Sequence, residues 1–477
     1  MSLPRLRLVA ACLGCTAAVL LHRQAENSKL PQGPYWPLAL GSAQDSATML
    51  RSPANFSKAL GWSWHHPGGR YHTTIAGGPV IDDQKNLYLT TNDGIRKLSA
   101  DGETLWWYRP PGDTNNQPSL MGGLVYGNTN NGFGFAVDQA TGKEVWKQQY
   151  EYDAGGDVGY PGGSDGVYVM GVKTGTVKNH GGGNQRVIGI DGKTGQKLWD
   201  YKTEWPVWNL MPLFPGEDSV VFMDFTGGVY RLGLHNGTEL WHARAPDVMK
   251  EAPSFSDGGV TVADGKAFAC SNPKTSGGSE GTQGVLRAFR LTDGLPLWAR
   301  TLPQPCNSWP AVGRLGDGPE LSVVVTPGSF MGSPVMHGGI MAFDAGSGSL
   351  QWKWQAPPFA HLGNMAVGDI EGYFERKIYD PRHPICLPAH WSAPLIMGDG
   401  AVLAGRSDGV LYKLRAPPQY EADLDTSRLP VVFETSPGVT VEDKFDAHGA
   451  SLHGAFAAAP GMLAFATCTD SLFVFKY

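Results

Sequence analysis

Charged residues are scarce in this sequence and form no long run of one sign. Only 17% of the 477 residues are Asp, Glu, Lys or Arg, and 38 basic against 44 acidic residues give a formal net charge of −6. A protein whose main partner is a nucleic acid would instead carry a pronounced basic patch. We therefore expect no nucleic-acid partner.

Long apolar segments are lacking as well. The stretch Leu8–Leu21 follows the basic residues Arg5 and Arg7 and contains no charge, but it spans only fourteen positions. This length is typical of the apolar region of a secretory signal peptide, whereas a membrane-spanning helix needs about 20 residues. The pattern predicts a secretory signal over residues 1–25 and an extracellular or periplasmic protein. A retained signal-anchor, which would hold the protein at a membrane, is the alternative.

The composition does not suit a helical bundle, because 64 glycines and 35 prolines make up about a fifth of the chain. This share is still below the roughly 25–30% that marks low-complexity disorder. The 15 Trp, 16 Tyr and 19 Phe residues provide ample material for a core. We expect a globular, all-β protein in which one closed architecture takes up most of the chain.

Six cysteines give only a weak indication of the compartment. Cys12 and Cys15 would be removed with the signal, which leaves the four thiols of Cys270, Cys306, Cys386 and Cys468. Four thiols allow three complete disulfide pairings, and the sequence does not choose among them. Buried free cysteines are an equally good interpretation for Cys270 and Cys468, which stand in apolar runs.

A glycine followed four residues later by a tryptophan occurs six times, where chance predicts about two. The pairs are Gly102/Trp106, Gly142/Trp146, Gly195/Trp199, Gly237/Trp241, Gly294/Trp298 and Gly348/Trp352. Each ends a segment such as GFAVDQATGKEVW, in which an alternating strand leads through a tight turn into a second strand. A single hairpin cannot bury its apolar face, so the units must stack, and we expect each indole to cover the seam to a neighbouring unit.

The two ends of the chain complete the set of units. GVLYKLRAPP, followed after an acidic insertion by LPVVFE near Phe433, predicts a seventh unit without its tryptophan. The C-terminal GMLAFATCTDSLFVFKY lacks an outer strand, and ALGWSWHH, with Trp62 and Trp64, is an outer strand without inner ones. Joining them, with Trp64 beside Phe473, closes a ring of eight four-stranded blades and leaves no free sheet edge there. The predicted fold is an eight-bladed β-propeller.

The repeated motif, seen as VDQATGKEVW and IDGKTGQKLW, resembles the tryptophan-docking repeat of the pyrroloquinoline-quinone (PQQ)-like family of eight-bladed propellers. The resemblance covers residues 60–477, which we assign to the propeller, with 26–59 as a linker after the signal. That family includes quinoprotein alcohol dehydrogenases as well as non-catalytic relatives that act in outer-membrane assembly. The resemblance therefore specifies the fold but not the function.

The loops that enter the innermost strands of a propeller meet at the mouth of its central channel. Amide, aromatic and imidazole side chains gather at these positions in the sequence: Asn116, Trp208, Asn209, Asn307, Trp309, His390, Trp391 and His448. Such a ring could clamp a planar or extended ligand, and we predict it as the ligand- or partner-binding site. The alternative is that Trp309 and Trp391, at equivalent positions of adjacent blades, simply plug the channel.

The resemblance to the quinoprotein dehydrogenases implies a bound quinone, a calcium-type ion, an Asp general base and commonly a disulfide between adjacent cysteines. This sequence contains no Cys-Cys pair and no CxxCH haem motif, and no carboxylate is matched to the base or the metal ligands. We therefore expect no cofactor and no metal, and assign no catalytic residue.

Two hypotheses follow. The first is an exported PQQ-like propeller that serves as a binding or assembly scaffold for a protein partner or a small-molecule ligand at its loop face. The alternative is a PQQ-dependent oxidoreductase, with a calcium-type ion, that acts on an alcohol or sugar.

Overall fold

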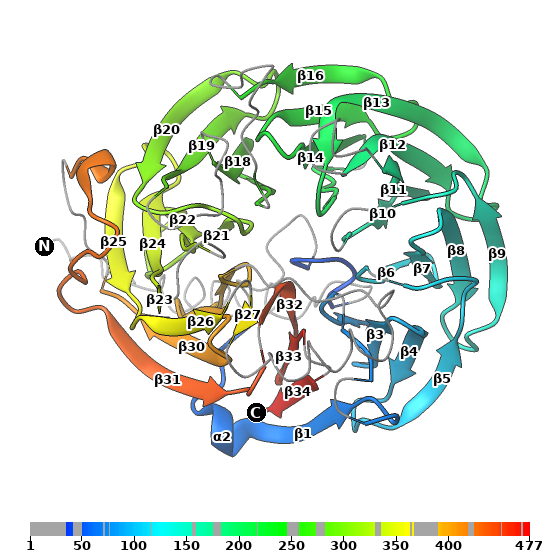
Figure 1. Cartoon of the computed structure of the whole chain (residues 1–477), viewed down its shortest axis with the longest axis horizontal. Helices are drawn as coiled ribbons and strands as arrows, with labels where there is room; N and C mark the ends of the chain where they lie inside the picture. Colours follow the sequence, from blue (N-terminus) through cyan, green and yellow to red (C-terminus); the bar gives the residue numbers. More distant parts are fainter. Residues whose placement is uncertain are drawn as a thin grey trace, which may run out of the picture.

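Radial antiparallel sheets surround a central axis in the computed structural model of the chain (Figure 1). The structure describes residues 35–41, 50–69, 72–75, 77–114, 116–154, 159–174, 183–216, 218–245, 256, 258–272, 282–329, 335–362, 365–366, 390–417, 424–449, 451–468 and 471–477. Within these ranges nearly all regular structure is β, beside helix α2 (Phe56–Ala59) and the 3-10 helix η3 (Thr426–Arg428). No helix in these ranges has the length and apolarity to cross a membrane. The predicted all-β, eight-bladed propeller is confirmed.

Blades one to four follow the chain, each from its inner to its outer strand. Blade one contains β2 (Val80–Ile81), β3 (Leu87–Thr91), β4 (Gly94–Leu98) and β5 (Thr104–Tyr108). Blade two contains β6 (Ser119–Met121), β7 (Leu124–Asn128), β8 (Phe133–Asp138) and β9 (Glu144–Gln149). Blade three contains β10 (Gly162–Ser164), β11 (Val167–Thr174), β12 (Asn184–Asp191) and β13 (Lys197–Val207). Blade four contains β14 (Ser219–Met223), β15 (Val229–Gly233) and β16 (Glu239–Ala243), and a bridge between Leu213 and Val221 forms its inner edge.

Blades five to seven repeat this order. Blade five contains β17 (Val260–Ala263), β18 (Lys266–Ser271), β19 (Gly284–Arg290) and β20 (Pro296–Leu302). Blade six contains β21 (Ala311–Gly313), β22 (Ser322–Val325), β24 (Gly339–Asp344) and β25 (Leu350–Gln355). Blade seven contains β28 (Leu395–Ile396), β29 (Val402–Gly405), β30 (Val410–Arg415) and β31 (Thr440–Asp446). A small additional sheet is formed by β23 (Val335–Met336), β26 (Phe359–Leu362) and β27 (Met365–Ala366).

Blade eight joins the two ends of the chain, as predicted. Its strands are β32 (Ser451–Ala459), β33 (Met462–Thr467), β34 (Ser471–Lys476) and, outermost, β1 (Leu60–His65). Trp64 lies opposite Leu472 rather than Phe473, which faces Ser63, so the predicted register is wrong by one residue. Paired residues in antiparallel strands share one face of the sheet, and Trp64 and Leu472 are both buried, whereas Ser63 is exposed. Burial of the indole therefore sets the register.

The repeated tryptophans dock on the next blade. The Trp146 indole of blade two donates a hydrogen bond to the carbonyl oxygen of Gly192 at 2.7 Å and lies on Gly195 of blade three. Gly195 has a φ of +75°, and a Cβ there would stand 2.7 Å from the indole, so the turn requires glycine on both counts. The same contact joins Trp62 to Gly102, Trp106 to Gly142, Trp199 to Gly237, Trp241 to Gly294 and Trp298 to Gly348. The predicted docking on a glycine is thus observed for five of the six repeated tryptophans and for Trp62 of the outer strand of blade eight, whereas Trp352 packs in an apolar cluster with residues of blades six and seven.

Replacing Gly195 by alanine is expected to lower the free energy of unfolding by roughly 1–3 kcal/mol more than replacing Gly166 of the same blade. Both glycines have a left-handed φ, +75° and +77°, but a Cβ on Gly166 meets no atom within 4 Å. Gly166→Ala therefore carries the backbone cost alone. Equilibrium unfolding in urea gives both values, and equal losses would show that the indole tolerates the methyl group.

Blade seven departs from the repeat. Its outer strand is β31, not the predicted LPVVFE, which lies in a long excursion between β30 and β31. Residues 424–439 of this excursion, here the outer strap, run outside β25 (Figure 1). Backbone and hydroxyl groups of Ser436 hydrogen-bond the backbone of Lys353 at 2.9 Å, and the Phe433 amide donates to the Gln355 side chain at 3.1 Å. The strap thereby covers the outer edge of blade six where the compact docking turn is missing.

A second segment from the N-terminal region enters the ring. Residues 35–41, here the channel segment, lie near the centre of the ring (Figure 1). Trp36 exchanges two backbone hydrogen bonds with Ile81 at 2.9 and 3.0 Å, and Pro37 accepts one from Leu120 at 2.9 Å. Leu38 packs with blades three and four, and Ala39 belongs to the apolar cluster that contains Trp309. The stretch assigned to a linker thus includes residues that bridge the inner edges of several blades.

Two of the cysteine assignments are resolved. Cys270 of β18 forms a disulfide with Cys306, and the two Cα atoms lie 5.5 Å apart. Cys468 is also disulfide-bonded, and Cys386 lies outside the described residues. The interpretation of Cys270 and Cys468 as buried free thiols is therefore wrong.

Candidate functional site

Most of the predicted channel-mouth residues lie inside the protein. Six of the eight are at most 5% exposed: Asn116, Asn209, Asn307, Trp309, His390 and Trp391. Trp208 is half-buried, and His448 is exposed and pairs with Asp446 at 3.2 Å. These residues lie in segments that precede innermost strands. A pattern of residues does not tell whether a loop side chain faces an open mouth or the packed wall beneath it.

The two tryptophans pack in neighbouring walls of the ring. Trp309 meets Tyr160 edge to face, with ring centroids 4.6 Å apart, and shares a cluster with Ala39 of the channel segment. Trp391 packs against Trp354 and lies 5.1 Å from the Arg406 guanidinium. Both indoles are thus engaged by other side chains of the ring.

His390 is fixed by a buried arginine that the sequence analysis did not single out. Its Nδ1 donates to the Ser329 carbonyl oxygen at 2.5 Å, so its Nε2 accepts from Arg406 Nε at 3.0 Å and the imidazole is neutral. Arg406 also donates to the Pro357 carbonyl and pairs with Asp408 at 3.3 Å. Burial lowers the pKa of Arg406, which the Asp408 charge opposes. Through the Pro357 carbonyl and the Phe359 ring, Arg406 holds blade seven to the start of β26.

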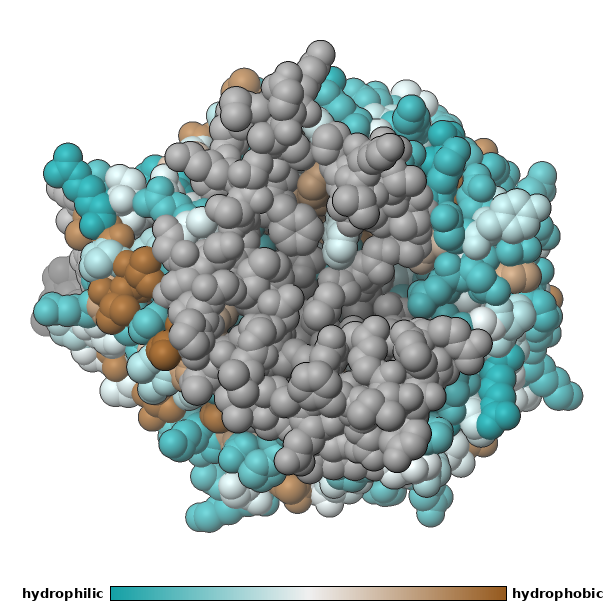
Figure 2. All heavy atoms as spheres, in the orientation of Figure 1, coloured by the Kyte–Doolittle hydropathy of each residue, from teal (hydrophilic) through white to brown (hydrophobic). Residues whose placement is uncertain are grey.

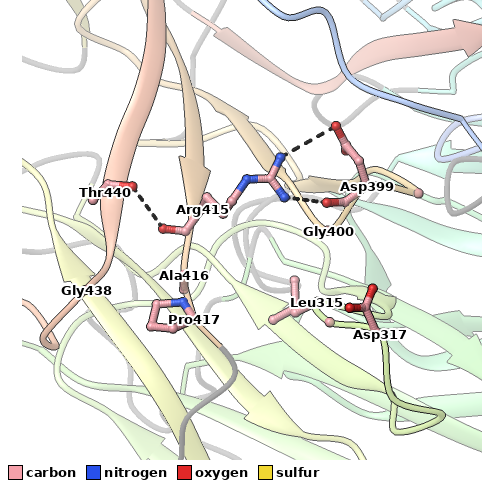
Figure 3. Close-up of a pocket in the computed structure, with 11 residues that line it drawn as sticks. Leu315, Asp317, Asp399, Gly400, Arg415, Ala416, Pro417, Gly438 and Thr440 are labelled. Atoms are coloured by element: carbon pink, nitrogen blue, oxygen red, sulfur yellow. Dashed lines mark hydrogen bonds and ion pairs between the residues drawn. The ribbon is translucent and has the colours of Figure 1, made fainter.

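A pocket of about 590 Å³ opens at the seam between blades six and seven (Figure 3). Hairpin turns of both blades and the two stems of the blade-seven excursion surround it. This seam pocket is lined by Leu315, Gly316, Asp317, Gly398, Asp399, Gly400, Arg415, Ala416, Pro417, Gly438 and Thr440. At the other docked seams a short turn fills the corresponding position, whereas here Pro417 and Gly438 begin and end the long excursion. The pocket exists because the repeat is interrupted.

A charge network forms one wall of the seam pocket. Arg415 pairs with Glu442 and lies 3.6 Å from Asp399, whose backbone oxygen it also binds. Burial alone would raise the pKa of Asp399, but hydrogen bonds from Ser52 and Ala401 and the Arg415 charge lower it on balance. The Glu442 carboxylate and the charge of Asp399 raise the pKa of Arg415. Asp317 stands across the pocket, away from this network (Figure 3).

A calcium-type ion beside a quinone needs a set of side chains that converge as metal ligands. No three His, Cys, Asp or Glu side chains converge in the described part of the chain. The buried carboxylates are engaged in their own turns: Asp224 accepts hydrogen bonds from Thr226, Gly228 and Tyr230 at 2.7 to 2.9 Å. Burial raises the pKa of Asp224 to about 6, against the effect of these bonds.

The exposed surface of the rim is largely hydrophilic. Figure 2 shows hydrophilic residues over most of the described rim and a gathering of hydrophobic residues on the side of blade six. Val335 of β23 and Val432 of the outer strap, 43% and 52% exposed, come from this part of the ring. Isolated aliphatic residues of this kind are common on protein surfaces and do not by themselves define a site.

Fold and repeat together define the class: the chain is a PQQ-like eight-bladed β-propeller with tryptophan-docked blades. A family profile described as outer membrane protein assembly factor BamB matches residues 57–206. A protein of that name from Xanthomonas campestris pv. campestris is 24% identical over 403 residues, which cover 79% of this chain and 90% of that protein.

Solved structures share the fold at low sequence identity. BamB from Moraxella catarrhalis superposes with a TM-score of 0.55 and 15% identity, over 88% of this chain and 99% of that one. A quinohemoprotein alcohol dehydrogenase from Comamonas testosteroni gives a TM-score of 0.56 and 13% identity, over 92% and 80%. A europium-containing methanol dehydrogenase gives 0.56 and 12%, over 95% and 100%. At these identities the superpositions establish the propeller and do not separate scaffold from enzyme.

Proposed function

We propose that this chain is an exported propeller that acts as a binding and assembly scaffold for protein partners in the cell envelope. The observation that carries the proposal is the relation to the Xanthomonas assembly factor, which extends over 90% of that protein's length at 24% identity. Similarity along the whole propeller, rather than in one blade, is what a shared surface for partners requires.

The proposal includes a location. Residues 1–25 serve as a secretory signal or as a retained anchor, residues 26–59 connect this segment to the propeller and contribute the channel segment, and residues 60–477 form the blades. The Cys270–Cys306 disulfide supports export, because structural disulfides persist mainly in oxidising compartments such as the periplasm. The loop face with its channel-mouth residues, of which His448 is exposed, remains the predicted contact surface for partners.

The test compares assembly with turnover in one preparation. A tagged full-length chain is expressed at native level, the envelope is extracted gently, and the native size of the tagged protein is measured before and after chemical crosslinking. We expect a complex larger than the monomer with a partner in fixed stoichiometry. The purified chain is then incubated with PQQ, calcium and an electron-accepting dye, and we expect no substrate-dependent dye reduction.

Two results would overturn the proposal. Quinone-dependent dye reduction with an alcohol or sugar would establish the oxidoreductase instead. A chain that stays monomeric in every gentle extract, with no crosslinked partner, would remove the basis for a scaffold.

A further inference from the structure

The seam pocket combines an apolar floor with a net negative wall. Leu315, Ala416 and Pro417 contribute aliphatic surface, and the first two pack against the apolar cluster that contains Trp352. The charged side chains around it are the carboxylates of Asp317, Asp399 and Glu442 and the cations Arg415 and Lys413. These three carboxylates and two cations together carry a net charge of −1.

The arginine in the wall is already neutralised. Arg415 contacts both Asp399 and Glu442, and Lys413 reaches Glu442 at 3.2 Å. An incoming anion would have to compete with these carboxylates and would meet the charge of Asp317 as well. The wall therefore disfavours phosphate or carboxylate ligands.

The Asp317 carboxylate can accept hydrogen bonds that no described residue donates to it. It is exposed at the tip of the turn between β21 and β22, and its carboxylate makes no hydrogen bond or ion pair with the residues that the structure describes. Its acceptor oxygens are open to a donor that enters the pocket.

We propose that the seam pocket binds a lysine or arginine side chain carried by an extended segment of a protein partner, a proposal that rests on the scaffold function above. These side chains combine an aliphatic stem with a cationic head, which matches an apolar floor beside a carboxylate. Gly316 and Gly398 of the lining are exposed and carry no side chain, so a partner main chain can approach them closely. The volume of about 590 Å³ holds the basic side chain together with part of its main chain.

The direct test uses a defined probe. Fluorescein-labelled nine-residue peptides of glycine and serine, with two central arginines or two central glutamates, are titrated with the full chain at low ionic strength and followed by fluorescence anisotropy. We expect the arginine peptide to bind and the glutamate peptide not to. Binding is expected to weaken as salt rises, because exposed charge pairs are screened within about 10 Å at 0.1 M.

Matched variants locate the site. Asp317→Lys reverses the charge in the pocket and is expected to weaken arginine-peptide binding about tenfold, whereas Glu320→Lys makes the same charge change in the same turn outside the lining and is expected to alter it less than twofold. Both residues are exposed, so neither change disturbs the core, and unchanged thermal midpoints check this. Equal weakening by both variants would reveal non-specific attraction and overturn the proposal, as would failure of the wild-type chain to bind the arginine peptide.

The envelope complex separates this inference from the function on which it rests. A complex seen with the wild-type chain and with Glu320→Lys but reduced with Asp317→Lys supports both. A complex that persists unchanged with Asp317→Lys refutes the role of the pocket and leaves the scaffold standing. Absence of any complex with the wild-type chain refutes the scaffold itself.

Discussion

Replacing the six residues of β1 with alternating glycine and serine is expected to lower the free energy of unfolding by more than about 5 kcal/mol. β1 is the outer strand of blade eight and pairs along its length with β34, the last strand of the chain. Without it, Trp64 no longer fills its buried site and the edge of β34 is left open. Because this sheet joins β1 to the last strand of the chain, its loss also removes the strand pairing that completes blade eight. Circular dichroism during thermal and urea unfolding measures the effect.

The control keeps β1 and changes its exposed face. Leu60→Thr combined with Ser63→Thr alters two exposed positions of the strand, introduces β-branched residues that favour a strand, and keeps the backbone pairing. Its stability is expected to stay within about 0.5 kcal/mol of the parent protein. If the glycine-serine replacement were equally harmless, blade eight would not hold the ring closed.

The propeller architecture could be predicted from the sequence because the same blade motif occurs several times along the chain. A docking indole and its glycine occur in six copies, so the spacing of Trp146 and Gly195 in one seam is supported by the others. The closure by β1 followed from counting strands rather than from any local pattern. The pairing of Trp64 with Leu472 could not be derived by counting strands. A one-residue slip changes which side chains face the core, and only the packing of those side chains decides the register.

The seventh outer strand was misassigned for a physical reason. LPVVFE has the β-branched and aromatic residues of a typical strand, whereas β31, with the sequence TVEDKFD, is mostly polar. An outermost strand in a propeller is largely exposed, and β31 contains no buried residue, so it needs no apolar pattern. The apolar run instead supplies the outer strap, where Phe433 is buried beside Gly339.

The seam pocket could not be predicted from the sequence, for a related reason. Its walls come from the turn that holds Asp317, the turn that holds Asp399 and the strand end at Arg415, which are separated by up to about a hundred residues. Nothing local marks any of them as part of a site. The one available signal was the acidic insertion that replaces the compact glycine turn of the seventh unit, which indicates an irregular seam but not its contents.

Trp36→Ala is expected to destabilise the protein by about 3–5 kcal/mol, the range found when a large buried aromatic side chain is truncated. Trp36 is 1% exposed, and its backbone hydrogen bonds to Ile81 extend a β2 strand of only two residues. The neighbouring Tyr35→Ala is the control, because Tyr35 is only partly buried against the same core and is expected to lose about 1 kcal/mol. Both variants keep the backbone bonds, so urea unfolding isolates the contribution of the buried indole. Equal and small losses of unfolding free energy would mean that the channel segment does not stabilise the ring. A large loss with Trp36→Ala alone would show that residues 35–41 are an integral part of the propeller.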